Sequence, residues 1–151
     1  MDQTRPKRGA LGRIAQVLTA ACLLAACSTG PELQGDVQPV TRCVDDSPTC
    51  IAARKAVLNH MLADHKRGWV NHTADAHTYA TGVRLFAFKS KKREMSCSEL
   101  KQGRREADAA PGVLRGPSGR QLTPAQISRG IMFAGEVSKE LAREIRRRCR
   151  G

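Results

Sequence analysis

The sequence predicts an all-α fold: a bundle of about four helices, stapled by two disulfides, after a signal peptide and a flexible tether. Aromatic residues make up 3% of the 151 residues and hydrophobic residues 40%, so the core must consist mainly of aliphatic side chains, whereas strands favour aromatic and β-branched ones. Residues suited to begin helices precede segments with apolar side chains at helical spacing. The length fits one modest domain, which we place at residues 43–151.

The first two predicted helices lie in the first half of this domain. The first follows Ser47 as N-cap and Pro48 in the first turn, and we expect Gly68 to end it. The second covers about residues 74–89, where apolar side chains recur at helical spacing. Residues 83–88 also alternate between polar and apolar, so a short strand is the alternative there.

The last two predicted helices have the clearest starts. The third covers about residues 96–109 and opens with Ser-Cys-Ser-Glu, a capping box. The fourth starts after Thr123, again with reciprocal capping residues, and carries an apolar stripe that reaches Ile145. Residues 111–120 are rich in glycine and proline, and this composition predicts a loop between the two helices.

The N-terminus, residues 1–26, has the organisation of an export signal. A basic start precedes an almost entirely apolar run, which is too short to span a bilayer. The run ends in Leu24-Ala25-Ala26-Cys27, which resembles the lipobox of bacterial lipoproteins. The resemblance implies cleavage before Cys27 and acyl chains, such as palmitate, on that cysteine, which would anchor the chain to a membrane. An ordinary signal peptide with a chance cysteine is the alternative.

The residues after the cleavage site refine the expected location. Ser28 directly follows the cysteine, and by the same resemblance a residue other than aspartate implies the outer membrane, with the domain facing the periplasm. Residues 27–42 contain proline, glycine and polar residues without periodicity, so we expect a flexible tether. The expected localisation is therefore the cell envelope.

The cysteine count predicts disulfides. With one cysteine in the signal and Cys27 lipidated, four remain, and an even count in an exported chain indicates a disulfide framework. Three pairings are open. We expect Cys43–Cys50, which enclose a short loop, and Cys97–Cys149, which stand at the start of the third helix and the end of the fourth. Zinc is the alternative, although close CxxC pairs are missing.

The charge predicts an anionic partner. The net charge is +12, and removing residues 1–26, with four basic and one acidic residue, leaves +9. Basic residues near helix ends can simply complement the helix dipoles, or they can form one binding surface. The candidates for that surface are Lys89, Lys91, Lys92, Arg93, Arg104, Arg105, Arg115 and Arg120. We expect anionic lipid, lipopolysaccharide, a cell-wall polymer or an envelope protein as partner. Nucleic acid is not expected, because aromatic residues and nucleic-acid motifs are scarce.

All four histidines lie between residues 60 and 77, with aspartates among them. His60 and Asp64 are four residues apart, and His72 and Asp75 three apart, so they are weak candidates for a zinc, copper or nickel site. Their simpler interpretation is as solvent-facing polar residues, and we expect no cofactor. The sequence also contains no GxSxG, P-loop or HExxH motif, so no enzyme is expected.

Four segments, residues 43–46, 83–88, 96–100 and 110–116, resemble small alphaproteobacterial lipoproteins. The resemblance covers most of the domain but implies no activity and no site. We therefore expect a lipid-anchored envelope protein with a structural or adaptor role, which contacts an anionic component or a protein through a basic surface. The alternative is a periplasmic metal-binding lipoprotein that uses the His60–His77 stretch.

Overall fold

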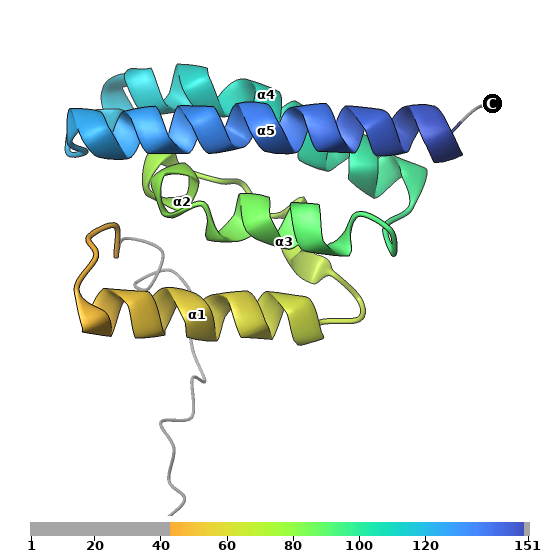
Figure 1. Ribbon diagram of the computed structural model, residues 1–151, viewed down its shortest axis with the longest axis horizontal. Coiled ribbons are helices and arrows are strands. Elements are labelled where there is room, and N and C mark those ends of the chain that lie inside the picture. Colours follow the sequence, from red (N-terminus) through yellow and green to blue (C-terminus); the bar gives the residue numbers. More distant parts are fainter. Residues whose placement is uncertain (1–42, 150–151) are drawn as a thin grey trace, which may run out of the picture. The chain divides into compact units, whose positions relative to one another are not determined.

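The computed structural model describes residues 43–149, which form an all-helical domain of five α-helices and two short 3-10 helices (Figure 1). No strand occurs within this range, so the predicted fold class is confirmed. Figure 1 shows the helices in three layers: α4 and α5 lie side by side, α2 and α3 pack beneath them, and α1 packs beneath α3. The predicted signal peptide, Cys27 and the tether lie outside the described residues.

Helix α1 (Pro48–Ala63) begins as predicted, because the Ser47 side chain accepts a hydrogen bond from the backbone N–H of Cys50. Its expected end at Gly68 is wrong. The Asp64 carboxylate accepts hydrogen bonds from the backbone N–H groups of Lys66 and Gly68, and these bonds hold a tight turn in place of further helix. The short helix η2 (Gly68–Asn71) follows.

The predicted second helix is two helices, α2 (Ala76–Thr81) and α3 (Val83–Lys91). They are divided at Gly82, whose φ of 70° lies in the left-handed region that glycine tolerates best. The Asp75 side chain caps α2 by accepting a hydrogen bond from the backbone N–H of Thr78. The alternative of a strand at residues 83–88 is wrong, since these residues are helical.

Helix α4 (Cys97–Arg115) opens with the predicted capping box but runs past its predicted end at residue 109. The expected loop at residues 111–120 is therefore wrong in its first half. A proline inside a helix removes one backbone hydrogen bond. Here Ala110 and Leu114, on either side of Pro111, are fully buried, and their packing offsets that loss. The remaining connection includes the short helix η3 (Pro117–Gly119).

Helix α5 (Pro124–Arg148) begins with the predicted capping box at Thr123 and runs antiparallel to α4. Both expected disulfides are confirmed. Cys97, at the start of α4, is bonded to Cys149, directly after α5, with their Cα atoms 5.7 Å apart. Cys43 and Cys50 are bonded across the loop before α1, with a Cα separation of 5.2 Å.

The core lies between the α4–α5 layer and α3, and it is mainly aliphatic, as expected. The largest fully buried side chains are Phe88, Leu85, Met95, Leu100, Leu114, Leu141 and Val137. The edge of one aromatic ring meets the face of another where Trp69 packs on Phe88, with the ring centroids 4.9 Å apart. No helix within residues 43–149 is long and apolar enough to cross a membrane.

One ion pair lies inside this core. The guanidinium of Arg84 in α3 donates to both carboxylate oxygens of Glu106 in α4, at 2.5 and 2.7 Å, and both side chains are about 95% buried. Arg84 also donates to backbone carbonyls of η2 and the residue after it, Trp69, Val70 and His72. With its donors shared in this way, Arg84 ties η2 and α3 to α4.

Candidate functional site

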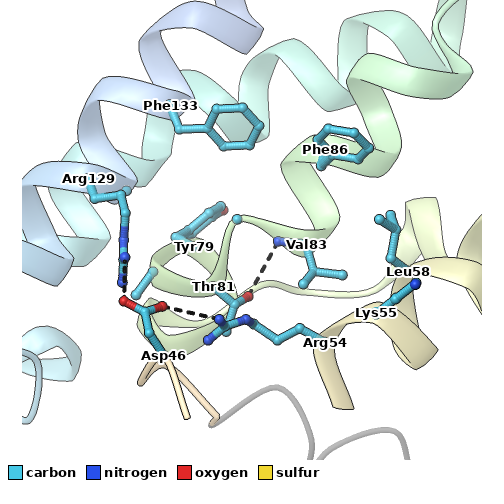
Figure 2. Close-up of a pocket in the computed structure, with 13 residues that line it drawn as sticks. Asp46, Arg54, Lys55, Leu58, Tyr79, Thr81, Val83, Phe86, Arg129 and Phe133 are labelled. Atoms are coloured by element: carbon cyan, nitrogen blue, oxygen red, sulfur yellow. Dashed lines mark hydrogen bonds and ion pairs between the residues drawn. The ribbon is translucent and has the colours of Figure 1, made fainter. Parts of the chain in front are cut away.

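An open groove of about 450 Å³ lies between α1, the α2–α3 junction and α5. Figure 2 shows Arg129, Asp46 and Arg54 grouped in one part of the lining and the rings of Phe86 and Phe133 in another, with Lys55 beside Leu58. This volume is within the range of small-molecule sites in proteins. The lining residues are Asp46, Arg54, Lys55, Leu58, Tyr79, Ala80, Thr81, Gly82, Val83, Phe86, Arg129, Gly130 and Phe133.

The apolar end of the groove is formed by two phenyl rings on neighbouring helices. Phe86 of α3 is 43% exposed, which is unusual for so large an apolar side chain, and Phe133 of α5 is half-buried beside it (Figure 2). Gly82 makes room for the second ring, because a Cβ atom at Gly82 would lie 3.2 Å from Cδ1 of Phe133. Leu58 of α1 and Val83 extend the apolar lining.

The charged end of the groove is organised around Asp46. Its carboxylate pairs with Arg54 of α1 at 3.3 Å and with Arg129 of α5 at 3.2 Å (Figure 2). The Arg129 guanidinium is the main reason why the pKa of Asp46 lies below its usual range. Lys55 also lines the groove, and it makes no ion pair with another residue in the range 43–149. Arg54 and Arg129 give this end of the groove two cations against the one carboxylate of Asp46, so it is positively charged.

The walls of the charged end are held by backbone contacts. Arg54 donates to the carbonyl oxygens of Cys43, at 3.0 Å, and of Asp45, at 2.5 Å. From α5, Gln126 donates to the carbonyl oxygen of Val44 at 3.3 Å. Because the Cys43–Cys50 disulfide joins the same loop to α1, the loop is bound to both helices that border the groove.

Some of the basic residues predicted to form one binding surface are neutralised inside the domain. Lys89 of α3 pairs with Glu136 of α5 at 2.5 Å and with Glu140 at 3.3 Å, and Lys92 also pairs with Glu140. Lys91 pairs with Glu94 at 2.9 Å. These lysines serve as links between α3 and α5 or as local pairs, so they are poor candidates for binding another molecule.

Other predicted basic residues remain accessible. Arg105, Arg115 and Arg120 are exposed and make no ion pair within the described range, and neither does Arg93, in the turn after α3. Arg104 is half-exposed and pairs with Asp108 at 3.5 Å. The structure therefore separates the predicted set into a paired group and an accessible group.

Further exposed cations join the accessible group. Lys101 and Arg105 are one helical turn apart on α4, and Lys139 and Arg143 are one turn apart on α5. Neither of the α5 residues makes an ion pair within residues 43–149, and the same holds for Lys101. We call Lys101, Arg105, Arg115, Lys139 and Arg143 the basic face; all five are exposed, three of them on α4 and two on α5.

The histidine stretch does not form a cluster. Within residues 43–149, no group of three or more His, Cys, Asp or Glu side chains lies close enough to hold a metal ion. His60 and His72 are exposed. Asp64 and Asp75 both bind backbone N–H groups, the first in the turn after α1 and the second as the N-cap of α2. His60 lies in the last turn of α1, and Asp64 directly follows the helix, with its backbone N–H donating to the carbonyl oxygen of His60.

Sequence reasoning did not find the groove. Its residues come from segments up to 87 positions apart. The one local signal is Phe86, because a helix that buries Leu85 and Phe88 does not need another large apolar side chain on its exposed side.

Comparison of the chain with protein-family models, with curated protein sequences and with solved structures returned no match. The resemblance to small alphaproteobacterial lipoproteins stays a prediction, and functional inference depends on the chain's own residues.

Proposed function

We propose that this protein is a lipid-anchored adaptor of the cell envelope, held to a membrane through Cys27, whose domain contacts an anionic lipid surface through the basic face. The observation that carries the proposal is the distribution of ion pairs. The glutamates neutralise cations between α3 and α5, at η2 and in the core, whereas Lys101, Arg105 and Arg115 of α4 face solvent without a carboxylate partner within the described range.

The charge balance of the domain supports an anionic partner. Residues 43–149 contain 20 basic and 11 acidic residues, so cations remain after the acids are paired. On α4 the carboxylate nearest the basic face is Asp108, which already pairs with Arg104 and accepts a hydrogen bond from Ser138 of α5. The face therefore has a net positive potential, which attracts polyanionic surfaces over several ångströms.

Lipid anchoring and a basic face complement each other physically. A cation near an anionic bilayer contributes about 1 kcal/mol, so five of them provide substantial but reversible binding. Acyl chains on Cys27 would anchor the protein stably in one membrane. The basic face would then be free to contact that membrane or a second anionic surface. Lipid phosphate and the phosphates of lipopolysaccharide share the chemistry that this face would recognise.

The test uses the full lipidated chain held in neutral phosphatidylcholine nanodiscs on a biosensor. Vesicles of phosphatidylglycerol, of phosphatidylcholine, and of phosphatidylcholine with lipopolysaccharide are passed over it at low and at physiological salt. We expect the two anionic preparations to bind and the neutral one not to bind, with affinity falling as salt rises. Equal binding of neutral and anionic vesicles would overturn the proposal.

A pair of matched variants assigns the binding to the basic face. Lys101→Glu with Arg105→Glu reverses two charges on α4, and we expect binding to anionic vesicles to fall at least about tenfold. Lys66→Glu with Arg93→Glu makes the same change in charge elsewhere on the domain, at two exposed residues, and should reduce binding much less. Equal losses in both variants would contradict a localised face. If the domain instead captured an envelope protein, and this binding did not depend on Lys101 and Arg105, the basic face would not be the adaptor surface.

A further inference from the structure

We propose that the groove between α1, the α2–α3 junction and α5 binds a single-chain amphiphile with an anionic head group, such as a long-chain carboxylate. The apolar chain lies against Phe86 and Phe133, and the head group lies at Arg129. This site is separate from the basic face and does not depend on the proposed function.

The shape and lining of the groove suit one apolar chain. The groove is open along one side, has a volume of about 450 Å³ and is lined mainly by apolar atoms. Phe86 is 43% exposed there, although apolar surface of this size is costly to leave in water. Covering this ring and the half-buried Phe133 with an alkyl chain would remove apolar area from water on both helices.

The charges of the groove select the head group. Figure 2 shows Arg129, Asp46 and Arg54 at one end of the lining and the two phenyl rings at the other, so polarity changes along the groove as it does along an amphiphile. Arg129 is half-exposed although it pairs with Asp46, and Lys55 is exposed and has no ion pair within residues 43–149. Arg129 can therefore reach an anion at the end that holds Asp46, and Lys55 adds an accessible cation beside Leu58, whereas a cationic head group would meet like charges.

The groove is also held in shape before any ligand arrives. The loop at its charged end is fixed by the Cys43–Cys50 disulfide and by the hydrogen bonds of Arg54 to that loop. At the apolar end, Lys89 joins α3 to α5 through Glu136 and Glu140 and lies 5.9 Å from the centre of the Phe133 ring. A preformed site loses less entropy on binding.

The experiment photolabels the purified full chain in the presence of neutral nanodiscs. The probe is a long-chain carboxylate with a diazirine near its methyl end, compared with the matching trimethylammonium probe, which enters the bilayer through the same chain. We expect the carboxylate to label peptides that contain residues 79–86 and 129–133, and the ammonium probe to label them at least about tenfold less. Equal labelling by both probes, or labelling spread over all helices, would overturn the proposal.

Matched variants localise the site. Phe86→Asp places a carboxylate at the exposed apolar end and should reduce labelling about tenfold or more. Met132→Asp makes the same kind of change at an α5 side chain that is 71% exposed and outside the groove, and should leave labelling unchanged. Circular dichroism melting checks that both variants fold. If both lose labelling equally, or if folded Phe86→Asp retains it, the groove is not the site.

Competition identifies the source of the head group. Excess dodecanoate and excess dodecyl phosphate are added separately to the carboxylate probe. We expect both to displace it, because the Arg129 guanidinium recognises either anion; the stronger competitor shows whether the groove prefers a free carboxylate or a phosphate-bearing lipid. Acetate, which has the head group without the chain, should not compete at the same concentration. Displacement by acetate would mean that the probe is held by its charge alone, against the proposal.

Discussion

Replacing Gly103 by alanine should destabilise the domain, although alanine favours helices. A Cβ atom at this position in α4 would lie 2.7 Å from Cε1 and 3.0 Å from Cγ of Phe88, and closer still to Cδ1. Apolar carbon atoms normally approach to about 3.5–4.0 Å. Phe88 is fully buried, packs on Trp69 and lies beneath the Arg84 guanidinium, 5.6 Å away, so its ring has little freedom to move aside.

The magnitude follows from two opposing terms. Exchanging glycine for alanine inside a helix stabilises it by about 1 kcal/mol. Overpacking a well-packed core costs about 1–3 kcal/mol. We therefore expect Gly103→Ala to lower the free energy of unfolding by about 1 kcal/mol, which corresponds to a fall in melting temperature of about 4–8 °C for a domain of this size.

The same helix contains the matched control. A Cβ atom at Gly112 would meet nothing within 4 Å, so Gly112→Ala should leave stability unchanged or raise it by up to about 1 kcal/mol. The assay is urea unfolding of both variants and the wild type, followed by circular dichroism at the α-helix signal. The reasoning would be refuted if Gly103→Ala were as stable as Gly112→Ala.

A double variant tests whether the Phe88 ring is the cause. Leucine at position 88 lacks the ring atoms that the new Cβ would approach. In a Phe88→Leu background, Gly103→Ala should therefore cost less than it does in the wild type, or become favourable. Additive effects of the two substitutions would show that the cost of Gly103→Ala comes from another contact.

Three further predictions concern stability. Replacing both Cys97 and Cys149 by serine should lower the free energy of unfolding by roughly 4 kcal/mol in the chain-entropy model, since the bridge spans 52 positions; a loss below 1 kcal/mol in urea unfolding would contradict it. Glu106→Gln should cost about 3–5 kcal/mol, because it leaves the buried charge of Arg84 without its partner, whereas apolar residues at both positions should recover most of this loss in the same assay. The Arg67 guanidinium, which donates hydrogen bonds to Glu99, holds the pKa of this carboxyl below the ordinary 4.5. The ionised form of Glu99 therefore stabilises the fold above that pH, and its contribution is lost as the pH falls through the lowered pKa. The stability difference between wild type and Glu99→Gln should therefore shrink between about pH 5 and pH 3, and a constant difference would contradict this.

The starts of α1, α4 and α5 could be predicted from the sequence, but the ends of α1 and α4 could not. Ser47, Ser96 and Thr123 begin helices because each side chain binds a backbone N–H group only three residues away. Such contacts depend on neighbouring residues alone. The end of α4, by contrast, depends on the burial of Leu114, which keeps the helix intact beyond Pro111 even though local rules predict a loop.

The two candidate sites were unequally visible in the sequence. The basic residues of α4 could be named from the sequence, yet their availability could not, because Lys89 and Lys92 are neutralised by glutamates about 47 positions away. The groove could not be predicted at all. Phe86 and Phe133 are brought together only by the packing of α3 on α5, and no pattern within either helix specifies the other as its neighbour.

The sequence by itself determined the helical class and the positions where the main helices begin, and among three possible pairings of the four cysteines it favoured the one that forms. These properties follow from composition, from contacts between near neighbours, and from the placement of Cys97 and Cys149 at the ends of two successive helices. Tertiary structure alone decided which cations remain unpaired and where an apolar groove opens beside Lys55 and Arg129. The physical reason is distance: ion pairing and burial depend on which segments meet in space, and that is settled only when the helices pack.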